Sequence, residues 1–196
     1  MPAKIFIWNG HPRAQSLCSG LADAYQRGAE GEGAVVRRMD VAEMTVSLEG
    51  FEGYTGKRQP LGDDLRAWQE ALEWCEHTVW LHPYWWGGMP AKMKAVVDQA
   101  MLPGFGFKYR DKGALWDKLL TGRTGDVIIT SDTPPWFDTL VYGRSGRKVL
   151  KNQVMGFVGI KSAKIVQMGA VKGAKEAKIR RWLQQANRMG QEAGRR

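Results

Sequence analysis

The residues best suited to hold a ligand form an aromatic segment, Pro83-Tyr84-Trp85-Trp86-Gly87-Gly88-Met89. This segment follows an apolar run that we expect to be a buried strand, and it precedes Pro90, where a helix is predicted to begin. Loops lie at the surface, and large aromatic side chains there usually face something flat. The glycine pair lets the backbone approach a ligand closely. The segment therefore predicts one wall of a pocket for a planar ring.

Two polar loops are expected to lie beside this aromatic segment. Residues 9–17 open a helix at Ser16, where the hydroxyl and the free N–H groups of the helix can hold a phosphate. Residues 130–137 supply hydroxyls and backbone donors from Thr130, Ser131 and Thr133. We expect Asp132 to hold the loop backbone, as aspartate commonly does in turns. A phosphate clamp beside a flat aromatic slot suits flavin mononucleotide or a similar ligand.

Motifs of other nucleotide-binding and catalytic sites are missing from the sequence. No Walker-type GxxxxGK[ST] sequence or GxGxxG fingerprint follows a predicted strand, and Gly104-Phe105-Gly106 follows a helix instead. The two cysteines, Cys18 and Cys75, suggest neither a disulfide framework nor a zinc site. We find no convincing catalytic triad, metal cluster or carboxylate pair. The sequence therefore predicts no metal and no catalytic side chain.

The elements that position these loops alternate along the chain. Apolar runs predict strands at 4–8, 35–39, 78–82, 126–130 and 163–168. Helices are predicted from Ser16, from Asp63 or Asp64, from Pro90 as the first helical residue, over about 145–157, and from Ala174. Loops are predicted at 43–62, at 104–123 and at 131–136, the last because two successive prolines continue neither element.

This alternation predicts an α/β fold of a single domain spanning residues 1–196. Strands that are apolar throughout indicate a parallel, doubly wound sheet covered on both faces. In a sheet of order 2-1-3-4-5 the three loops are neighbours, and ligands bind beyond the carboxyl ends of the strands.

The net charge of +9 is unevenly distributed, since residues 140–196 hold 14 basic and 2 acidic side chains. Such asymmetry can indicate a nucleic acid or an anionic surface, it can draw a phosphorylated nucleotide toward a pocket, or it can be a solvated basic helix. No apolar stretch reaches the length of a membrane span, and the N-terminal run is too short for a signal peptide. With the sparse cysteines, these features predict a cytoplasmic location.

The chain resembles the flavodoxin-like NAD(P)H:quinone oxidoreductases, a group that includes DT-diaphorase, the modulator of drug activity B and the ancillary flavoproteins of glutathione-gated potassium efflux systems. The resemblance spans roughly residues 3–170 and rests on three blocks, which are Asn9-Gly10-His11-Pro12 with Ser16, the segment from His82 to Lys94, and Pro103-Gly104-Phe105-Gly106-Phe107. The middle block is the most specific, because the family has a proline, a tryptophan and then Pro-Ala, an aliphatic residue and Lys on the following helix.

The resemblance implies a set of flavin-binding positions. Contacts with the flavin phosphate and ribityl chain are implied for His11, Ser16, Leu17 and Cys18. The isoalloxazine-lining segment is implied for Pro83, Tyr84, Trp86 and Gly87, and the third flavin loop for Thr130, Ser131, Asp132 and Thr133. DT-diaphorase has a glycine pair in place of Asp132-Thr133, and it has a tyrosine and a histidine proposed to assist the hydride step, for which this chain has no clear match.

Other aromatic residues are expected to lie around this flavin site. Trp85 cannot stack on the same flavin face as Trp86, so we expect it to pack against a neighbouring helix or a second subunit and to matter mainly for stability. Phe105, Phe107 and Tyr109 are expected to form a lid or substrate wall. The family forms homodimers with sites at the subunit interface, which offers a use for aromatic residues around 105–116.

The resemblance implies an FMN-dependent oxidoreductase that passes hydride from NADPH or NADH to quinones or similar acceptors by a two-electron, ping-pong reaction. FMN is expected rather than FAD, because the C-terminal extension of the larger FAD-binding members is missing; the basic C-terminal third favours NADPH. One alternative is a flavin-binding regulatory subunit of a potassium efflux system, peripheral to the membrane. A one-electron carrier is disfavoured by the positive charge, and no nucleic-acid partner is expected.

Overall fold

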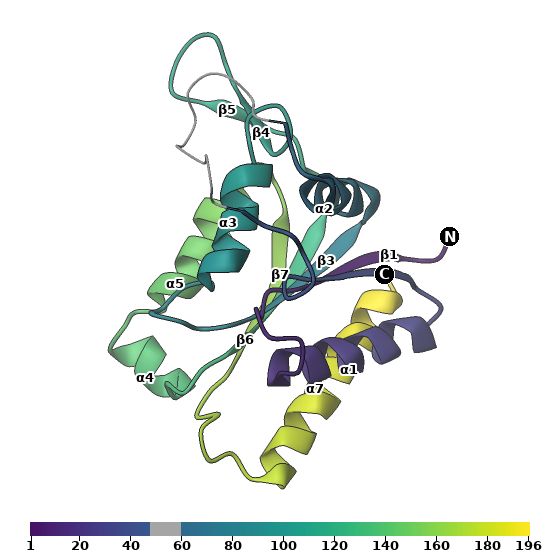
Figure 1. Ribbon diagram of the computed structural model, residues 1–196, viewed down its shortest axis with the longest axis vertical. Helices are drawn as coiled ribbons and strands as arrows, with labels where there is room; N and C mark the ends of the chain where they lie inside the picture. Colours follow the sequence, from purple (N-terminus) through teal and green to yellow (C-terminus); the bar gives the residue numbers. More distant parts are fainter. Residues whose placement is uncertain (48–59) are drawn as a thin grey trace.

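A five-stranded parallel sheet forms the centre of the molecule in the computed structural model, which describes residues 1–47 and 60–196 (Figure 1). Its strands are β1 (Lys4–Asn9), β2 (Val35–Asp40), β3 (His77–Pro83), β6 (Thr124–Thr130) and β7 (Lys161–Met168). They lie in the order β2-β1-β3-β6-β7, and neighbouring strands are parallel. Counting only these strands, the order is 2-1-3-4-5, so the predicted doubly wound fold is confirmed.

Helices cover both faces of the sheet, as the apolar strands predicted. One face packs against α1 (Leu17–Gly31) and α7 (Glu176–Gly194). The other packs against α2 (Asp63–Trp74), α3 (Ala91–Ala100) and a helical segment over residues 145–158. Side chains alternate between the two faces along each strand, so Phe6 and Trp8 enter one core while Ile5 and Ile7 enter the other.

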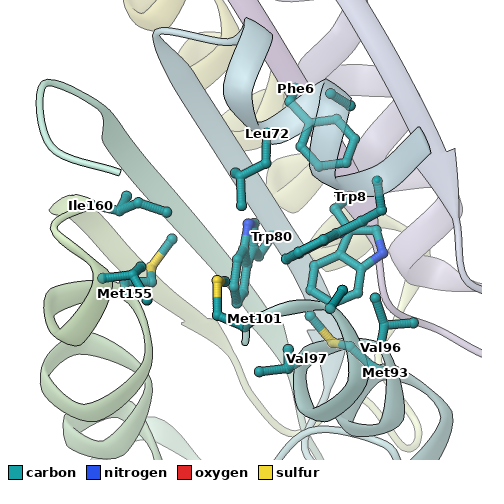
Figure 2. Close-up of a cluster of buried hydrophobic side chains, with 14 of the residues drawn as sticks. Phe6, Trp8, Leu72, Trp80, Met93, Val96, Val97, Met101, Met155 and Ile160 are labelled. Atoms are coloured by element: carbon teal, nitrogen blue, oxygen red, sulfur yellow. The ribbon is translucent and has the colours of Figure 1, made fainter. Parts of the chain in front are cut away.

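Large aromatic side chains fix the strand ends that carry the loops. Trp8 on β1 meets Trp80 on β3 edge to face, with ring centroids 4.9 Å apart, and it meets Trp68 of α2 at 5.0 Å. Figure 2 shows Trp8 and Trp80 side by side between the sheet and the side chains of α3, including Met93. This dense packing holds the carboxyl ends of β1 and β3 in one arrangement.

The helical segment after α4 contains an irregular stretch. It consists of α5 (Ser145–Lys148), a π-helical turn over Val149–Met155 and α6 (Gly156–Val158). The helix predicted over about 145–157 is therefore confirmed in position. Single π-helical turns inside α-helices are frequent at functional sites.

Three local predictions need correction. The expected loop at 104–123 contains an antiparallel pair, β4 (Phe107–Tyr109) and β5 (Trp116–Lys118). The double proline does not exclude a helix, because α4 (Pro135–Leu140) begins at Pro135, where a missing N–H costs nothing. Pro90 is the residue before α3 rather than its first helical residue.

Part of one prediction lies outside the described residues. The expected loop at 43–62 includes residues 48–59, while residues 45–47 and 60–62 have neither helix nor strand. Among the helices of the described ranges, none has the length and apolar character needed to cross a membrane.

Candidate functional site

The three predicted loops meet at the carboxyl ends of β1, β3 and β6 and enclose a cavity of about 200 Å³. Every loop contributes to its walls. The lining residues are His11, Arg13, Leu17, Cys18, Pro83, Tyr84, Trp85, Thr130, Ser131, Asp132 and Val171. The structure thus brings together most of the residues that the sequence singled out, and it adds Arg13, Trp85 and Val171.

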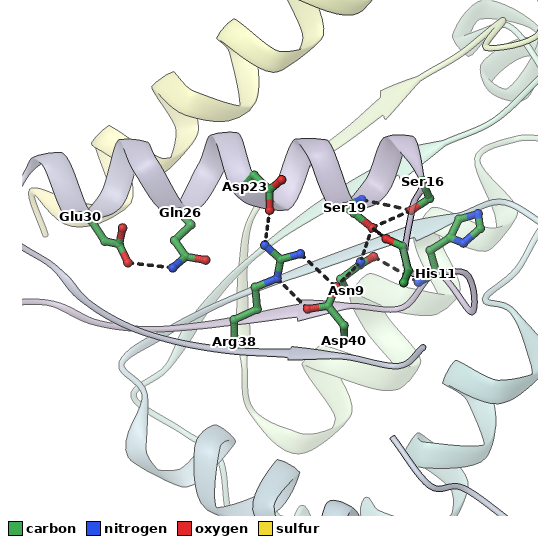
Figure 3. A network of polar contacts seen from close by, with 10 residues as sticks. Asn9, His11, Ser16, Ser19, Asp23, Gln26, Glu30, Arg38 and Asp40 are labelled. Carbon is green, nitrogen blue, oxygen red and sulfur yellow. Dashed lines mark hydrogen bonds and ion pairs between the residues drawn. The ribbon is translucent and has the colours of Figure 1, made fainter. Parts of the chain in front are cut away.

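The loop after β1 is held by a network of hydrogen bonds around Asn9 (Figure 3). The Asn9 side-chain oxygen Oδ1 accepts from the His11 backbone N–H at 3.2 Å. The Asn9 amide nitrogen donates to Ser19 Oγ at 3.1 Å and to Asp40 Oδ1 at 2.5 Å. The side chain of a fully buried residue therefore ties the loop to both α1 and β2.

Ser16 begins α1 as its N-cap, as predicted. Its hydroxyl oxygen accepts from the Ser19 backbone N–H at 3.2 Å and contacts Ser19 Oγ at 2.9 Å. Among the described residues, Ser16 is not part of the cavity lining, whereas Leu17 and Cys18 are. The Ser16 hydroxyl thus caps α1, and a direct phosphate contact from it stays a prediction. The first N–H groups of α1, at Leu17 and Cys18, are placed to receive an anion.

Two basic side chains face the same end of the cavity. The Arg13 backbone N–H donates to His11 Nδ1 at 3.0 Å, so the proton of the neutral imidazole lies on Nε2. Burial and the nearby Arg13 charge lower the pKa of His11, so the ring is neutral at pH 7. His11 Nε2 is therefore a donor. The predicted ligand contact at His11 agrees with its position in the lining.

The aromatic segment folds into a tight two-residue turn. Trp85 and Gly88 exchange backbone hydrogen bonds of 3.1 and 3.0 Å, and the two residues between them have φ of 53° at Trp86 and 74° at Gly87. Positive φ at both central positions is the geometry of a type I′ turn. A bulky side chain at positive φ is strained, and such strain clusters at functional sites. The turn holds the Trp86 indole fully exposed at its tip.

Trp86 and Gly87 line a second, larger cavity of about 720 Å³ that also contains Thr133 and shares Tyr84 with the first. The other lining residues are Asp138, Val141, Tyr142, Ser145 and Gly146. Trp85 faces the first cavity, with its ring edge toward His11 at 5.9 Å between centroids, and is about half exposed. The expectation that Trp85 packs against a neighbouring helix or a second subunit stays a prediction, and its place in the lining of the first cavity was not expected.

Helix α5 approaches the back of the aromatic turn very closely. A Cβ atom on Gly146 would lie 2.0 Å from the Gly87 carbonyl oxygen and 2.4 Å from the Tyr84 hydroxyl, so glycine is required here. Beside this contact, the buried Asp138 carboxylate pairs with Arg147 at 2.6 Å. A pair nine residues apart on two short helices has no pattern in the sequence, which explains why it was not predicted.

The Tyr84 hydroxyl remains without a protein partner among the described residues, although its oxygen is buried. Burial and the Asp138 carboxylate raise the pKa of Tyr84 to about 12, while the neighbouring Arg147 side chain and its backbone N–H oppose this shift. The Arg147 backbone N–H is close enough to the Tyr84 hydroxyl to affect its pKa, but the two groups do not make a hydrogen bond of normal geometry. Tyr84 is therefore a neutral phenol with hydrogen-bonding capacity left for a ligand.

The loop after β6 uses its own polar groups for support. Asp132 Oδ1 accepts from the Lys172 backbone N–H at 2.7 Å, which confirms the predicted role of Asp132 in holding loop backbone. Ser131 Oγ donates to the Thr133 carbonyl at 2.7 Å and accepts from Gln167 at 2.8 Å. The Ser131 hydroxyl proton is thus occupied, so any contact from this residue to a ligand must come from other groups.

Thr130 and Cys18 meet on the inner wall of the first cavity, with Oγ1 and Sγ 3.4 Å apart. Burial raises the pKa of the Cys18 thiol to about 11, against a smaller opposing effect of Thr130. The thiol is protonated at neutral pH, and a protonated thiol is a poor nucleophile. Cys18 therefore serves as a cavity wall.

The three residues expected to form a lid or substrate wall lie elsewhere. Phe105 is buried in the core, with its ring centroid 6.4 Å from that of Trp68, so its predicted role needs correction. Phe107 is half-buried against Phe157, with centroids 4.9 Å apart, and Tyr109 is exposed. Neither Phe107 nor Tyr109 is among the lining residues of the two cavities, so a substrate role for them remains a prediction.

A phosphate-compatible helix start and an aromatic turn lie at the carboxyl edge of a 2-1-3-4-5 sheet, so the chain is a protein of the doubly wound α/β class. Residues 3–189 match the family model described as a flavodoxin-like fold. The chain therefore belongs to this flavodoxin-like family.

Two proteins of known description are similar in sequence. An FMN-dependent NADH:quinone oxidoreductase of Cereibacter sphaeroides is 27% identical over 175 residues, which cover 89% of this chain and 81% of that protein. A ribosyldihydronicotinamide dehydrogenase-like protein of Penicillium crustosum is 26% identical over 151 residues, which cover 65% of this chain. This alignment covers 57% of the Penicillium protein's length.

Solved structures share the architecture. An NAD(P)H:quinone oxidoreductase from Methanothermobacter marburgensis superposes with a TM-score of 0.78 at 19% identity, over 95% of this chain and 96% of that one. An FMN-dependent NADH-azoreductase from Bacillus anthracis, in complex with FMN, gives a TM-score of 0.71 at 21% identity, over 98% of each chain. At these identities the likeness establishes the shared fold.

Proposed function

We propose that this protein binds FMN and reduces quinones or similar acceptors with NADPH or NADH as the hydride donor. The observation that carries the proposal is the convergence of the three loops on two cavities that share Tyr84, the first with a basic, N–H-rich lining and the second with aromatic walls. The sequence similarity to a protein described as an FMN-dependent NADH:quinone oxidoreductase supports it.

The residues present fit FMN at both ends of the site. The free N–H groups of Leu17 and Cys18, with Arg13 and the helix dipole, suit a phosphate dianion. The unpartnered Tyr84 hydroxyl and the Trp86–Gly87 turn suit the polar edge and the face of an isoalloxazine. When bound, FMN supplies hydride chemistry, taking two electrons from the nicotinamide and giving them to the acceptor.

The chain's own residues then bind and orient the reactants. The larger cavity borders the Trp86 indole and Tyr142, which offer flat surfaces for a nicotinamide or a quinone ring. Because donor and acceptor would use this same cavity, they would occupy it in turn, which gives ping-pong kinetics. The neutral Tyr84 hydroxyl can accept a hydrogen bond from a polar group at the cavity edge.

A homodimer is part of the same proposal. Large apolar side chains are exposed around the second cavity, and contiguous exposed apolar surface commonly marks an interaction site. These are Trp86, Trp136, Leu140, Val141, Tyr142 and Val149. A second copy of the chain would cover them, and the molar mass in solution by light scattering would test this arrangement.

The absorbance spectrum of the purified protein tests the flavin assignment. Flavin peaks near roughly 375 and 450 nm should be present, directly or after FMN reconstitution, and anaerobic NADPH should bleach them. Steady-state turnover with menadione should then give parallel double-reciprocal lines. A protein that retains no FMN after reconstitution would overturn the proposal, and bleaching without menadione turnover would overturn the quinone reductase activity.

A further inference from the structure

A third cavity, of about 350 Å³, lies behind the aromatic turn and is not needed for the proposed flavin site. Its walls come from β3, the turn, α3 and the helical segment after Ser145. The lining residues are His82, Tyr84, Gly87, Gly88, Met89, Lys94, Ser145, Gly146, Val149 and Leu150. Tyr84, Gly87, Ser145 and Gly146 also line the 720 Å³ cavity, so the tight contact of Gly146 with the turn forms a common wall.

His82 lines this cavity and has a buried ring nitrogen without a partner among the described residues. The residue is 1% exposed, and its Nδ1 lies 2.9 Å from the Pro83 carbonyl oxygen. A carbonyl can only accept, so Nδ1 carries the proton and Nε2 carries a lone pair. Burial lowers the pKa of His82 to about 4, so the ring stays neutral at physiological pH. Nε2 has no protein partner among the described residues, and a buried polar atom left unpaired is unfavourable.

The Tyr84 hydroxyl is the second unsatisfied polar group in the lining. Its ring centroid is 6.0 Å from that of His82, and its buried oxygen has no protein partner in the described part of the chain. As a neutral phenol, Tyr84 can donate one hydrogen bond and accept others. Met89, Val149 and Leu150 offer apolar surface within the same space. Lys94, also in the lining, is paired with Asp98 at 2.6 Å.

We infer that this cavity binds a one- or two-ring phenol, whose hydroxyl donates to His82 Nε2 and accepts from the Tyr84 hydroxyl while its ring lies on Met89, Val149 and Leu150. A hydroxyl is the group that satisfies both atoms, because it donates and accepts at once. A quinone carries only acceptors and leaves Nε2 unpaired. The cavity volume is within the range of small-molecule sites. Such a site selects hydroxylated rings, hydroquinones included, over their oxidised forms.

The phenol site is distinct from the proposed hydride transfer, because His82, Met89 and Leu150 line neither of the two cavities assigned to FMN and its reactants. A protein that fails to bind FMN could still bind a phenol behind the turn. FMN retention, measured by flavin absorbance, is therefore recorded separately from phenol binding in the experiment below.

Crystals of the FMN-loaded protein soaked with 4-bromophenol locate the site through the anomalous signal of bromine. We expect a bromine peak among Met89, Val149 and Leu150, with the phenol oxygen within hydrogen-bond distance of His82 Nε2. In solution, 4-bromotoluene, which replaces the hydroxyl by a methyl group, should bind about tenfold more weakly to the unmodified protein. Equal affinity for the two probes, a bromine peak only in the 720 Å³ cavity, or a cavity filled by water or by a side chain of a second copy would overturn the proposal.

Variants of His82 separate hydrogen bonding from shape. His82→Phe keeps a ring but removes the acceptor, so 4-bromophenol affinity should fall about tenfold and its advantage over 4-bromotoluene should disappear. His82→Gln keeps an acceptor oxygen and should retain part of that advantage. A phenol preference that survives in His82→Phe contradicts the assignment. If His82→Phe does not fold, the two probes on the unmodified protein still decide the question.

Discussion

The loop that follows β1 and the loop that follows β3 meet at the same cavity but differ in how their polar groups are satisfied. Around Asn9, the side-chain amide, two serine hydroxyls and the α1 cap bond to one another or to Asp40 (Figure 3). At the aromatic turn, Trp86 is strained and exposed, and the Tyr84 hydroxyl and His82 Nε2 have no protein partner among the described residues. The first loop is organised in advance, whereas the second leaves capacity for ligands.

This contrast indicates that the two loops contribute to ligand binding in different ways. Because the hydrogen bonds of the first loop are already made, the N–H groups of Leu17 and Cys18 are held in place. An anion can therefore bind there with little further loss of conformational entropy. An unsatisfied, strained turn is stabilised by what it binds, because strain persists only where the surrounding structure or a ligand compensates for it. Substitutions in the two loops should therefore act differently on stability and on binding.

The largest effect is expected for Gly146→Val, since the new side chain would collide with the Gly87 carbonyl and the Tyr84 hydroxyl. Moving α5 away from the turn should lower the free energy of unfolding by about 3 kcal/mol and weaken FMN binding. Urea denaturation and FMN titration would measure the two effects. Gly31→Val is the matched control, because a Cβ there meets nothing within 4 Å. Equal effects of the two substitutions would show that the turn does not depend on this contact.

A pH effect of similar size is expected from His82. Its pKa is lowered from 6.5 to about 4 in the folded chain, so the unfolded state binds the extra proton at higher pH. Stability therefore falls as pH drops from about 6.5 toward 4, by up to about 3 kcal/mol. His82→Gln should lack this part of the pH dependence when the free energy of unfolding is measured across that range. An identical pH profile for the wild type and His82→Gln would contradict the neutral, buried state of His82.

Asn9→Ala tests the preorganised loop. The substitution removes the bonds to Ser19, Asp40 and the His11 N–H, and it should cost about 1–2 kcal/mol in unfolding free energy. FMN affinity should fall with it, because the start of α1 loses its support. Gln26→Ala, which removes an exposed bond to Glu30, is the control and should change stability by less than about 0.5 kcal/mol. If Asn9→Ala is as stable as the unmodified protein and binds FMN with the same affinity, the proposed difference between the two loops is wrong.

The smallest effect on the free energy of unfolding is expected for Trp86→Gly, and any change should be stabilising. Glycine adopts the positive φ without strain, so unfolding free energy should stay the same or rise by up to about 1 kcal/mol while turnover or FMN retention falls. Trp85→Ala should also weaken FMN binding, since Trp85 lines the first cavity. A large loss of stability in Trp86→Gly, seen in a urea titration, would mean that the indole packs into the fold.

The alternation of strands and helices could be predicted because it follows from local patterns, which are the apolar strands, the helix periodicity and the Ser16 cap. The resemblance to flavodoxin-like oxidoreductases implied the strand order, and that order places the three loops together. The roles within the loops depended on geometry that sequence does not contain. Trp85 and Trp86 are adjacent and identical in type, and only the positive φ at Trp86 sends the two rings to different cavities.

The remaining differences between the predictions and the structure come from tertiary packing. Phe105 follows a Gly-rich pattern that suggested an exposed loop, yet its ring enters the core beside Trp68. The Asp138–Arg147 pair joins two short helices, α4 and α5, and no spacing rule connects the two residues. The short ribbon of β4 and β5 has three residues per strand, too few for a periodic signal.

A crystal structure of the protein with FMN would test the central claim most directly. The account predicts the phosphate within hydrogen-bond distance of the Leu17 and Cys18 N–H groups, near Arg13, and the isoalloxazine against the Trp86–Gly87 turn with a polar atom bonded to the Tyr84 hydroxyl. FMN bound with its phosphate away from the start of α1, or with its ring away from the aromatic turn, would contradict the account.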